Sequence, residues 1–171
     1  MARVPIQVLV VPYRRGNTGL QVLLLRRADF DIWQFVAGGG ETAESIEQTA
    51  RREGFEEAGI PMSASYLKLD ATATIPACWF SAWRNWPATT LLVPEHAFAV
   101  DATGYDPVIS EEHVEWRWAS MDEAIALLRF DSNRVALWEL HERLYPGPRT
   151  KRPAFDVRHD GCPCSQPPRR G

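Results

Sequence analysis

The segment 38–60, GGGETAESIEQTARREGFEEAGI, joins a run of three glycines to a short helix rich in acidic residues. Ser45 and Gln48 have the spacing of a capping box, which predicts that the helix begins there. Gly59 followed by Pro61 predicts its end, because glycine favours the left-handed position after a helix and proline cannot continue one. The sequence therefore predicts a glycine-rich turn, a helix and a loop.

Three glutamates in the last turns of this helix, Glu53, Glu56 and Glu57, fall on one face at about 100° per residue. Like charges at this spacing repel each other and weaken a helix. Their grouping is favourable if a hard divalent cation lies among them, because Mg²⁺ and Mn²⁺ prefer oxygen ligands. A solvated acidic face is the alternative interpretation, so the three glutamates alone do not establish a metal site.

The whole segment resembles the Nudix box, G-x5-E-x7-R-E-U-x-E-E-x-G-U, in which U is an apolar residue. The matching positions are Gly38, Glu44, Arg52, Glu53, Glu56, Glu57, Gly59 and Ile60. One position departs, because Gly54 replaces the bulky aliphatic residue. Glycine inside a helix costs about 0.5–1 kcal/mol relative to alanine. The departure therefore concerns stability and packing rather than the acidic ligands.

The resemblance implies an α/β (α+β) fold in which a mixed β-sheet lies between α-helices. It also implies a hydrolase that uses water and Mg²⁺ or Mn²⁺ to split a nucleoside diphosphate linked to another group. The metal ligands that it implies are Gly38, through its carbonyl, Glu44, Glu53, Glu56 and Glu57. Arg52 is expected to assist catalysis with these glutamates, since an arginine fork can hold one carboxylate in a bidentate pair.

A catalytic base outside the box is expected shortly before the strand 113–119. Glu111 and Glu112 both stand there, and alignment with the pattern E-H-x-x-x-x-W favours Glu112. A solvated pair of glutamates is the alternative interpretation.

The flanks of the box resemble one subgroup of the family, the bacterial dihydroneopterin triphosphate diphosphatases. The stretches that carry this likeness are 23–27 (LLLRR), 31–36 (DIWQFV), Glu112-His113 with Trp118, and 132–134 (SNR). Each is shorter and less specific than the box. The likeness implies a pterin triphosphate substrate that loses pyrophosphate.

Six residues are candidates for substrate binding: Arg26, Arg27, Trp33, Gly39, Gly40 and Arg134. The two arginines end a predicted strand that leads to the site, where one of them is expected to grip a phosphate. The glycines allow close backbone approach. Trp33 is either a stacking platform for a flat ring or a core residue. Residues 132–134 either grip a phosphate or cap the last helix.

Strands and helices alternate along the rest of the chain. Apolar, β-rich stretches predict extended segments at 6–12, 20–26, 64–73 and 86–93, with a loop at 99–107. The alternation over 113–119 predicts a half-buried strand with Val114, Trp116 and Trp118 on its apolar face. Ser120 is expected to cap a helix.

A last helix is expected over 133–144, with Val135, Leu137, Trp138 and the stretch 140–144 on its core side. These elements define one domain, 1–145. From residue 146 the chain contains six prolines, six Lys or Arg and two Asp, a composition that predicts a basic tail, 146–171, without a core of its own. The tail is interpreted as a loose extension; an arm across a partner subunit in a homodimer is the alternative.

Charge and composition exclude several classes of protein. The net charge of −3, about −7 without the tail, argues against a surface for nucleic acid, and no apolar run approaches the roughly 20 residues that span a bilayer. Cys78, Cys162 and Cys164 are too few and too badly spread for a disulfide framework, which favours a reducing cytoplasm. A zinc site at Cys162, Cys164 and the nearby His159 would lack a fourth ligand.

The predicted function is therefore an Mg²⁺-dependent (or Mn²⁺-dependent) pyrophosphohydrolase acting on a small nucleotide or pterin triphosphate, with no nucleic-acid or membrane partner. Two alternatives stay open: hydrolysis of ordinary or damaged nucleoside triphosphates or dinucleotide polyphosphates, and a non-catalytic domain that senses a nucleotide. An isomerase on the same fold is less favoured, because Cys78 is far from the box in the sequence.

Overall fold

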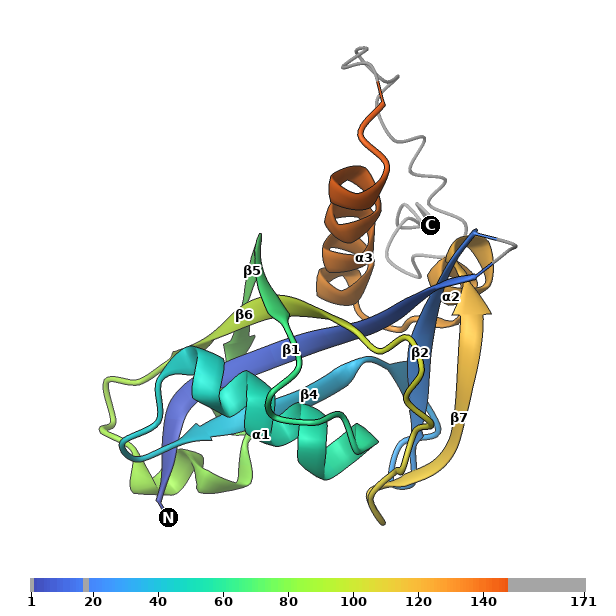
Figure 1. Ribbon diagram of the computed structural model, residues 1–171. Coiled ribbons are helices and arrows are strands. Elements are labelled where there is room, and N and C mark those ends of the chain that lie inside the picture. Colours follow the sequence, from blue (N-terminus) through green and yellow to red (C-terminus); the bar gives the residue numbers. More distant parts are fainter. Residues whose placement is uncertain (1, 17–18, 148–171) are drawn as a thin grey trace, which may run out of the picture.

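The computed structural model describes residues 2–16 and 19–147, which form a seven-stranded sheet with helices on both faces (Figure 1). The elements in chain order are β1 (Arg3–Gly16), β2 (Gly19–Arg27), β3 (Trp33–Gln34), β4 (Val36–Glu41), α1 (Ile46–Ala58), β5 (Tyr66–Pro76), the 3₁₀ turns η1 (Ala77–Trp79) and η2 (Ser81–Asn85), β6 (Leu92–Asp101), β7 (His113–Ser120), α2 (Met121–Leu127) and α3 (Asp131–Leu144).

The long strand β1 organises the sheet, whose order is β3-β2-β1-β6-β5. Its first part pairs antiparallel with β4 and its last part with β2, while its other edge pairs parallel with β6. Strand β7 pairs antiparallel with β2. Because β1 changes partner along its length, the β4 edge and the β2 edge diverge from it, and α1 lies along the β4 part.

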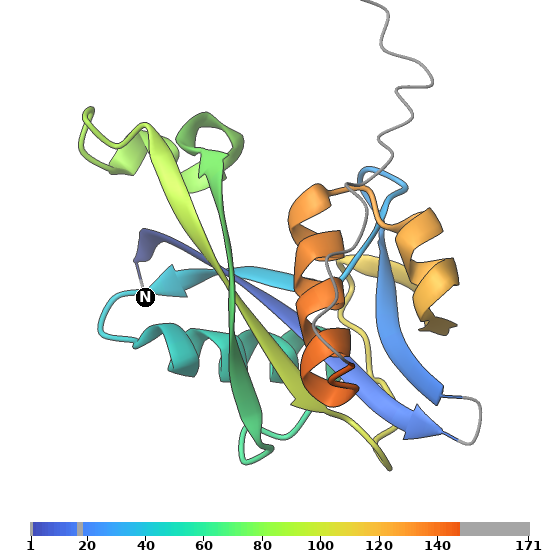
Figure 2. The same cartoon turned by 90° about the horizontal axis from the view of Figure 1, so that it is seen from above.

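The core lies in two layers, one on each face of the sheet. Alternate residues of β1 point to opposite faces: Val8 and Val10 pack toward α1, whereas Leu9 and Val11 pack toward α2 and α3. Figure 2 shows α1 and α3 on opposite sides of the strands. The predicted mixed sheet between helices is thus confirmed. No helix within the described ranges is long and apolar enough to cross a membrane.

The three glycines do not form a turn, as the sequence predicted, but belong to β4. Gly38 pairs with Val8 and Gly39 with Gln7 of β1. The turn follows at residues 42–43, where Ala43 has a φ of 74°. Glycine usually favours turns, but here the neighbouring strand β1 provides backbone hydrogen bonds that hold the three glycines in an extended strand.

The expected strand at 86–93 is largely wrong, because the strand β6 begins only at Leu92. The expected loop at 99–107 is confirmed over 102–107, but it begins three residues later than predicted because β6 runs through Asp101. Residues 86–91 instead connect η2 to β6 and include a turn in which the Thr90 amide donates to the Pro87 carbonyl over 2.8 Å. Burial explains the shift, since β6 pairs with β1 on one edge and β5 on the other, and 93 and 97–100 are buried.

Two predicted faces are right only in part, since Trp118 of β7 and Leu140 of α3 contact the core as expected. On β7, His113 is buried and Val114 and Trp116 are exposed. On α3, Leu137 is buried as expected, but Val135 and Trp138 face outward. Apolar residues occur on more than one side of both elements, so the pattern alone does not say which side is covered.

Both predicted capping boxes are present, at Ser45 and at Ser120. Cys78 is a free, exposed thiol. Cys162, Cys164 and almost all of the predicted tail 146–171 lie outside the described residues, so the division at 145/146 stays a prediction.

Candidate active site

The three box glutamates of helix α1 differ in how deeply they are buried. Glu53 and Glu57 are 3% and 6% exposed, whereas Glu56 lies on the open side of the helix. The capping box at its start and the left-handed Gly59 at its end, with a φ of 69°, fix the helix between two loops. Two of these three glutamates are therefore buried against the sheet.

Gly38 makes room for the carboxylate of Glu53. A Cβ at position 38 would lie 1.9 Å from Cδ of Glu53 and 2.2 Å from each carboxylate oxygen, far inside contact distance. The glycine is needed for close approach rather than for a special backbone angle.

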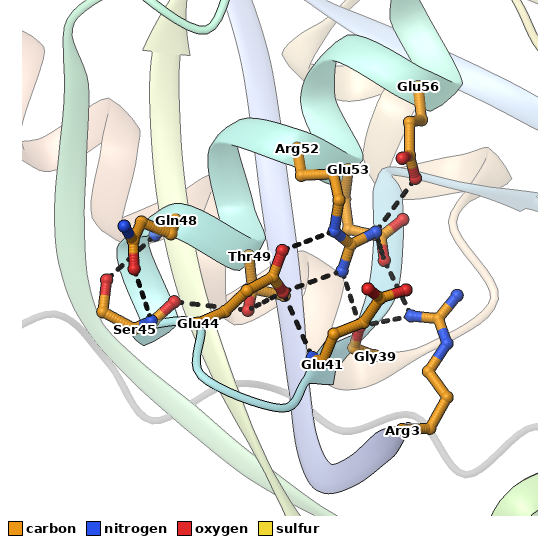
Figure 3. A network of polar contacts seen from close by, with 10 residues as sticks. All are labelled: Arg3, Gly39, Glu41, Glu44, Ser45, Gln48, Thr49, Arg52, Glu53 and Glu56. Atoms are coloured by element: carbon orange, nitrogen blue, oxygen red, sulfur yellow. Dashed lines mark hydrogen bonds and ion pairs between the residues drawn. The ribbon is translucent and has the colours of Figure 1, made fainter. Parts of the chain in front are cut away.

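Arg52 holds three carboxylates and one carbonyl together (Figure 3). Its Nε and Nη2 donate to the two oxygens of Glu44 over 2.7 and 3.1 Å, which is the expected bidentate fork. Its Nη1 donates to Glu53 over 2.8 Å and to Glu56 over 2.9 Å, and its Nη2 also donates to the Gly39 carbonyl over 2.9 Å. This pairing lowers the pKa of Glu44 to about 2.

Arg3 approaches the same oxygens from the start of β1, and nothing in the sequence indicated it. Its Nη1 donates to Glu53 Oε1 over 3.0 Å and to the Gly39 carbonyl. Two guanidinium groups thus converge on the carboxylate of Glu53 and the carbonyl of Gly39.

Glu57 is the most strongly perturbed acid of the site. Its Oε2 accepts from the Ala37 amide over 3.2 Å and lies 4.0 Å from Nε2 of the buried His113. Burial, with the nearby charge of Glu53, raises the pKa of Glu57 to about 8. A positive charge near this carboxylate would favour its ionised form.

These oxygens fit a divalent cation in chemistry, although they are not gathered as a finished ligand sphere. Among residues 2–16 and 19–147 no three acidic, histidine or cysteine side chains are close enough to hold one ion. Instead, the positively charged guanidinium groups of Arg52 and Arg3 donate hydrogen bonds to Glu53 and to the Gly39 carbonyl. Carboxylate and carbonyl oxygens are the donors that Mg²⁺ and Mn²⁺ prefer. The chemistry of these donors therefore fits such an ion.

A cavity of about 440 Å³ opens beside these carboxylates, a size typical of small-molecule sites. Glu53 and Glu57 line one part of it, and Trp79, Phe80 and Trp86 line another. Its walls therefore combine acidic oxygens with flat aromatic rings.

Four further predicted residues line this cavity: Arg27, Gly38, Gly39 and Glu112. The Arg27 guanidinium is held by both oxygens of Asp29, over 2.7 and 2.6 Å. This bond, followed by the charges of Asp29, Glu112 and Glu57, outweighs the effect of burial and raises the pKa of Arg27.

Arg26 and Trp33 are not brought to the cavity. Arg26 forms ion pairs with Asp31 over 3.1 Å and with Glu115 over 3.2 Å. Trp33 packs against the core on the α3 side, with the Arg117 guanidinium 4.6 Å above its ring.

Gly40 and Arg134 do not line the cavity either. A Cβ at Gly40 would meet Val4 at 3.0 Å, so this glycine serves the contact between β4 and the start of β1. Arg134 donates to the carbonyls of Ile125 and Leu128 and pairs with Asp131. It ties α2 to α3, which leaves its predicted grip on a phosphate without geometric support.

The aromatic wall comes from the connection between β5 and β6, which lies over the start of β1. Trp86 Nε1 donates to the Arg3 carbonyl over 2.8 Å, and the rings of Phe80 and Trp86 are 5.7 Å apart. The density of Trp and Phe over 79–86 was visible in the sequence, but nothing there placed it beside the box. Gln34, which belongs to the stretch 31–36, also lines the cavity, and so does Glu95, which is part of no motif.

A family model described as the NUDIX domain matches residues 4–139. The dihydroneopterin triphosphate diphosphatase of Escherichia coli (strain K12) is 33% identical over 135 residues, which cover 78% of this chain and 89% of that protein. The asymmetrical bis(5′-nucleosyl)-tetraphosphatase of Sus scrofa is 30% identical over 131 residues, covering 75% of this chain and 83% of that one.

Among solved structures, a protein of Listeria monocytogenes str. 4b F2365 described as a NUDIX hydrolase superposes with a TM-score of 0.75 at 45% identity. The match covers 82% of this chain and 94% of that one.

Proposed function

The chain belongs to the Nudix family and is a hydrolase of phosphoric anhydride bonds, and from that premise we propose that it is an Mg²⁺- or Mn²⁺-dependent pyrophosphohydrolase of a small triphosphate. The observation that carries this proposal is one cavity lined both by two box carboxylates, those of Glu53 and Glu57, and by aromatic rings that include Trp79, Phe80 and Trp86. A triphosphate joined to a flat heterocycle matches both walls, because its phosphates can bind a cation held by the carboxylates and its ring can stack on the aromatic side chains.

The carboxylates of Glu53, Glu56 and Glu57 would hold the cation, with Glu44 and the Gly38 carbonyl as further oxygen donors. A bound divalent cation supplies neutralising charge for polyphosphate oxygens and lowers the pKa of water. The chain's own part is to keep these acids close together despite their repulsion. Arg52 does so by bonding Glu44, Glu53 and Glu56 at once.

Two other groups of the cavity have complementary roles in the proposal. Arg27, kept in place by Asp29, offers positive charge to a phosphate. Glu112 is the proposed general base, because it lines the same cavity as the box acids and a carboxylate can accept a proton from attacking water.

Dihydroneopterin triphosphate is the first candidate substrate, supported by the name of the Escherichia coli relative and by the aromatic wall. Dinucleotide polyphosphates are the second candidate, supported by the name of the Sus scrofa relative. Both contain a flat ring and a phosphoric anhydride bond, so the aromatic wall alone does not choose between them.

The test is a screen for released phosphate and pyrophosphate, over nucleoside triphosphates, dinucleotide polyphosphates and dihydroneopterin triphosphate, with Mg²⁺ and with Mn²⁺. Glu56→Gln and Glu57→Gln should remove nearly all turnover while the proteins stay folded. Glu47→Gln is the matched control, because Glu47 lies on the same helix and pairs with Arg51 instead. Wild-type rates in both box variants at saturating Mg²⁺ would refute the mechanism. Tight binding without release of either product would favour a sensor.

A further inference from the structure

Glu95 is a buried acid that the hydrolytic machinery does not use. It lies in β6, is 6% exposed and lines the large cavity. Its backbone position pairs with Gln7 of β1, another cavity residue. The carboxyl therefore belongs to the sheet surface that floors the cavity, away from α1.

This carboxyl has one neutral partner and no cationic one. The Ser132 side chain, at the start of α3, is hydrogen-bonded to Glu95. Within residues 2–16 and 19–147, no ion pair involves Glu95. Burying an acid without charge compensation is costly. Burial accordingly raises the pKa of Glu95, against the opposing effect of Ser132.

A ligand edge with two adjacent N–H donors would compensate this acid. An ionised carboxylate only accepts, and it accepts best from two parallel donors. The ring N–H and exocyclic amino group of a 2-amino-4-oxo heterocycle, as in guanine or a pterin, form such an edge. Adenine instead has an acceptor, a ring nitrogen, beside its amino group. That nitrogen would face the carboxylate, so two hydrogen-bond acceptors would repel each other.

The surroundings of Glu95 fit such a ring. Gln7 and Gln34 line the same cavity and provide amide donors and acceptors for the remaining polar atoms of the ring. Trp79 and Trp86 line it too, and aromatic rings of this kind stack on flat heterocycles.

Resting on the proposed function, we propose that Glu95 is the specificity-determining residue of a subsite for the donor edge of a 2-amino-4-oxo heterocycle, so that the enzyme selects guanine-like or pterin-like triphosphates over adenine-like ones. Selection arises because a wrong ring leaves a buried carboxylate without its donors. Sites built to pair a substrate N–H reject analogues that lack it.

The test compares kcat/KM for dihydroneopterin triphosphate, GTP, ITP and ATP. ITP keeps the ring N–H and lacks the amino group, so wild-type kcat/KM should fall by about tenfold to a hundredfold from GTP to ITP, and further for ATP. Glu95→Gln replaces one acceptor by a donor and should lower kcat/KM for GTP by a similar factor while leaving ATP unchanged or better. Glu115→Gln, on β7 and outside the cavity, is the control and should preserve every ratio.

A binding measurement separates this inference from the proposed function. Tryptophan fluorescence would follow binding of the β,γ-imido analogues of GTP and ATP to the wild type and to Glu95→Gln. If the wild type hydrolyses neither the four triphosphates nor a dinucleotide polyphosphate, the proposed function fails, yet a guanine preference that Glu95→Gln abolishes would still support the subsite. Equal binding of both analogues by the wild type, or equal losses for both in Glu95→Gln, would overturn it. Should Glu95→Gln not fold, the wild-type GTP-to-ITP ratio decides.

Discussion

The hydroxyl of Tyr66 occupies the space into which a side chain on Gly54 would project. A Cβ at position 54 would lie 2.1 Å from that oxygen and 3.2 Å from Cζ of the same ring. Tyr66 begins β5 and its ring lies 5.0 Å from the Arg51 guanidinium. The aliphatic residue that the box would place on α1 is thus replaced by an aromatic ring from the sheet, which accounts for the glycine.

This relationship predicts that Gly54→Ala destabilises the protein. Overpacking costs about 1–3 kcal/mol, more than the roughly 1 kcal/mol that alanine gains over glycine inside a helix. We expect a net loss of about 1 kcal/mol in the free energy of unfolding, measured by urea denaturation. In a Tyr66→Phe background the loss should shrink, since the clashing hydroxyl is gone. Equal losses in both backgrounds would show that Tyr66 is not the obstacle.

Gly38→Ala should weaken metal binding because its Cβ would displace the carboxylate of Glu53. We expect Mn²⁺ affinity to fall by about tenfold to a hundredfold, the range found when the support of a metal ligand is lost. Electron paramagnetic resonance of free Mn²⁺ measures this without substrate. Gly39→Ala is the matched control, because a Cβ there would meet Arg3 Nη1 at 3.3 Å and no carboxylate. Similar losses in both variants would contradict the steric explanation.

The box residues could be predicted from sequence because a helix fixes their mutual spacing. Glu53, Glu56 and Glu57 share a face wherever the helix lies, and Arg52 is close to them by the same geometry. Arg3 and Tyr66 could not be predicted in this way. Each reaches α1 from a strand whose pairing depends on the whole sheet.

The same distinction holds for the fold and the cavity. Elements with local signals, such as the capping boxes at Ser45 and Ser120, begin where predicted. The boundaries of β6 and the strand state of Gly38 depend on partners distant in sequence, and both were wrong. Glu95 gave no signal because a single acid within an apolar run does not reveal which face it lies on.

Ionisation of Glu57 predicts a pH dependence of stability in protein treated with EDTA. Its pKa is raised from 4.5 to about 8, so the folded protein retains a proton that the unfolded chain has released. The free energy of unfolding should therefore decrease as the pH rises from about 4.5 to about 8. Thermal unfolding across this window should show a steeper fall of Tm for the wild type than for Glu57→Gln.

His113 makes the comparison with Glu57→Gln necessary, because its contribution has the opposite sign. Burial, followed by the charge of Arg27, lowers the pKa of His113 below 6.5, so its contribution to stability is lost as the pH falls. Saturating Mg²⁺ should reduce the difference between the two proteins, since a cation beside Glu57 favours its charged form. If the two Tm profiles run parallel in EDTA, the raised pKa of Glu57 is wrong.

Glu112 and Glu111 offer a test of the general base within one dipeptide. Glu112 lines the cavity with Glu53 and Glu57, whereas Glu111 does not contribute to its lining. If Glu112 accepts the proton of the attacking water, Glu112→Gln should lower kcat by about 10²–10⁴-fold, the usual contribution of general acid–base catalysis. KM and Mn²⁺ affinity should change little. Glu111→Gln carries the same change of charge and should keep the wild-type kcat. Equal effects of the two substitutions would mean that the pair acts through its charge, and the base would have to be sought among the other acids of the cavity.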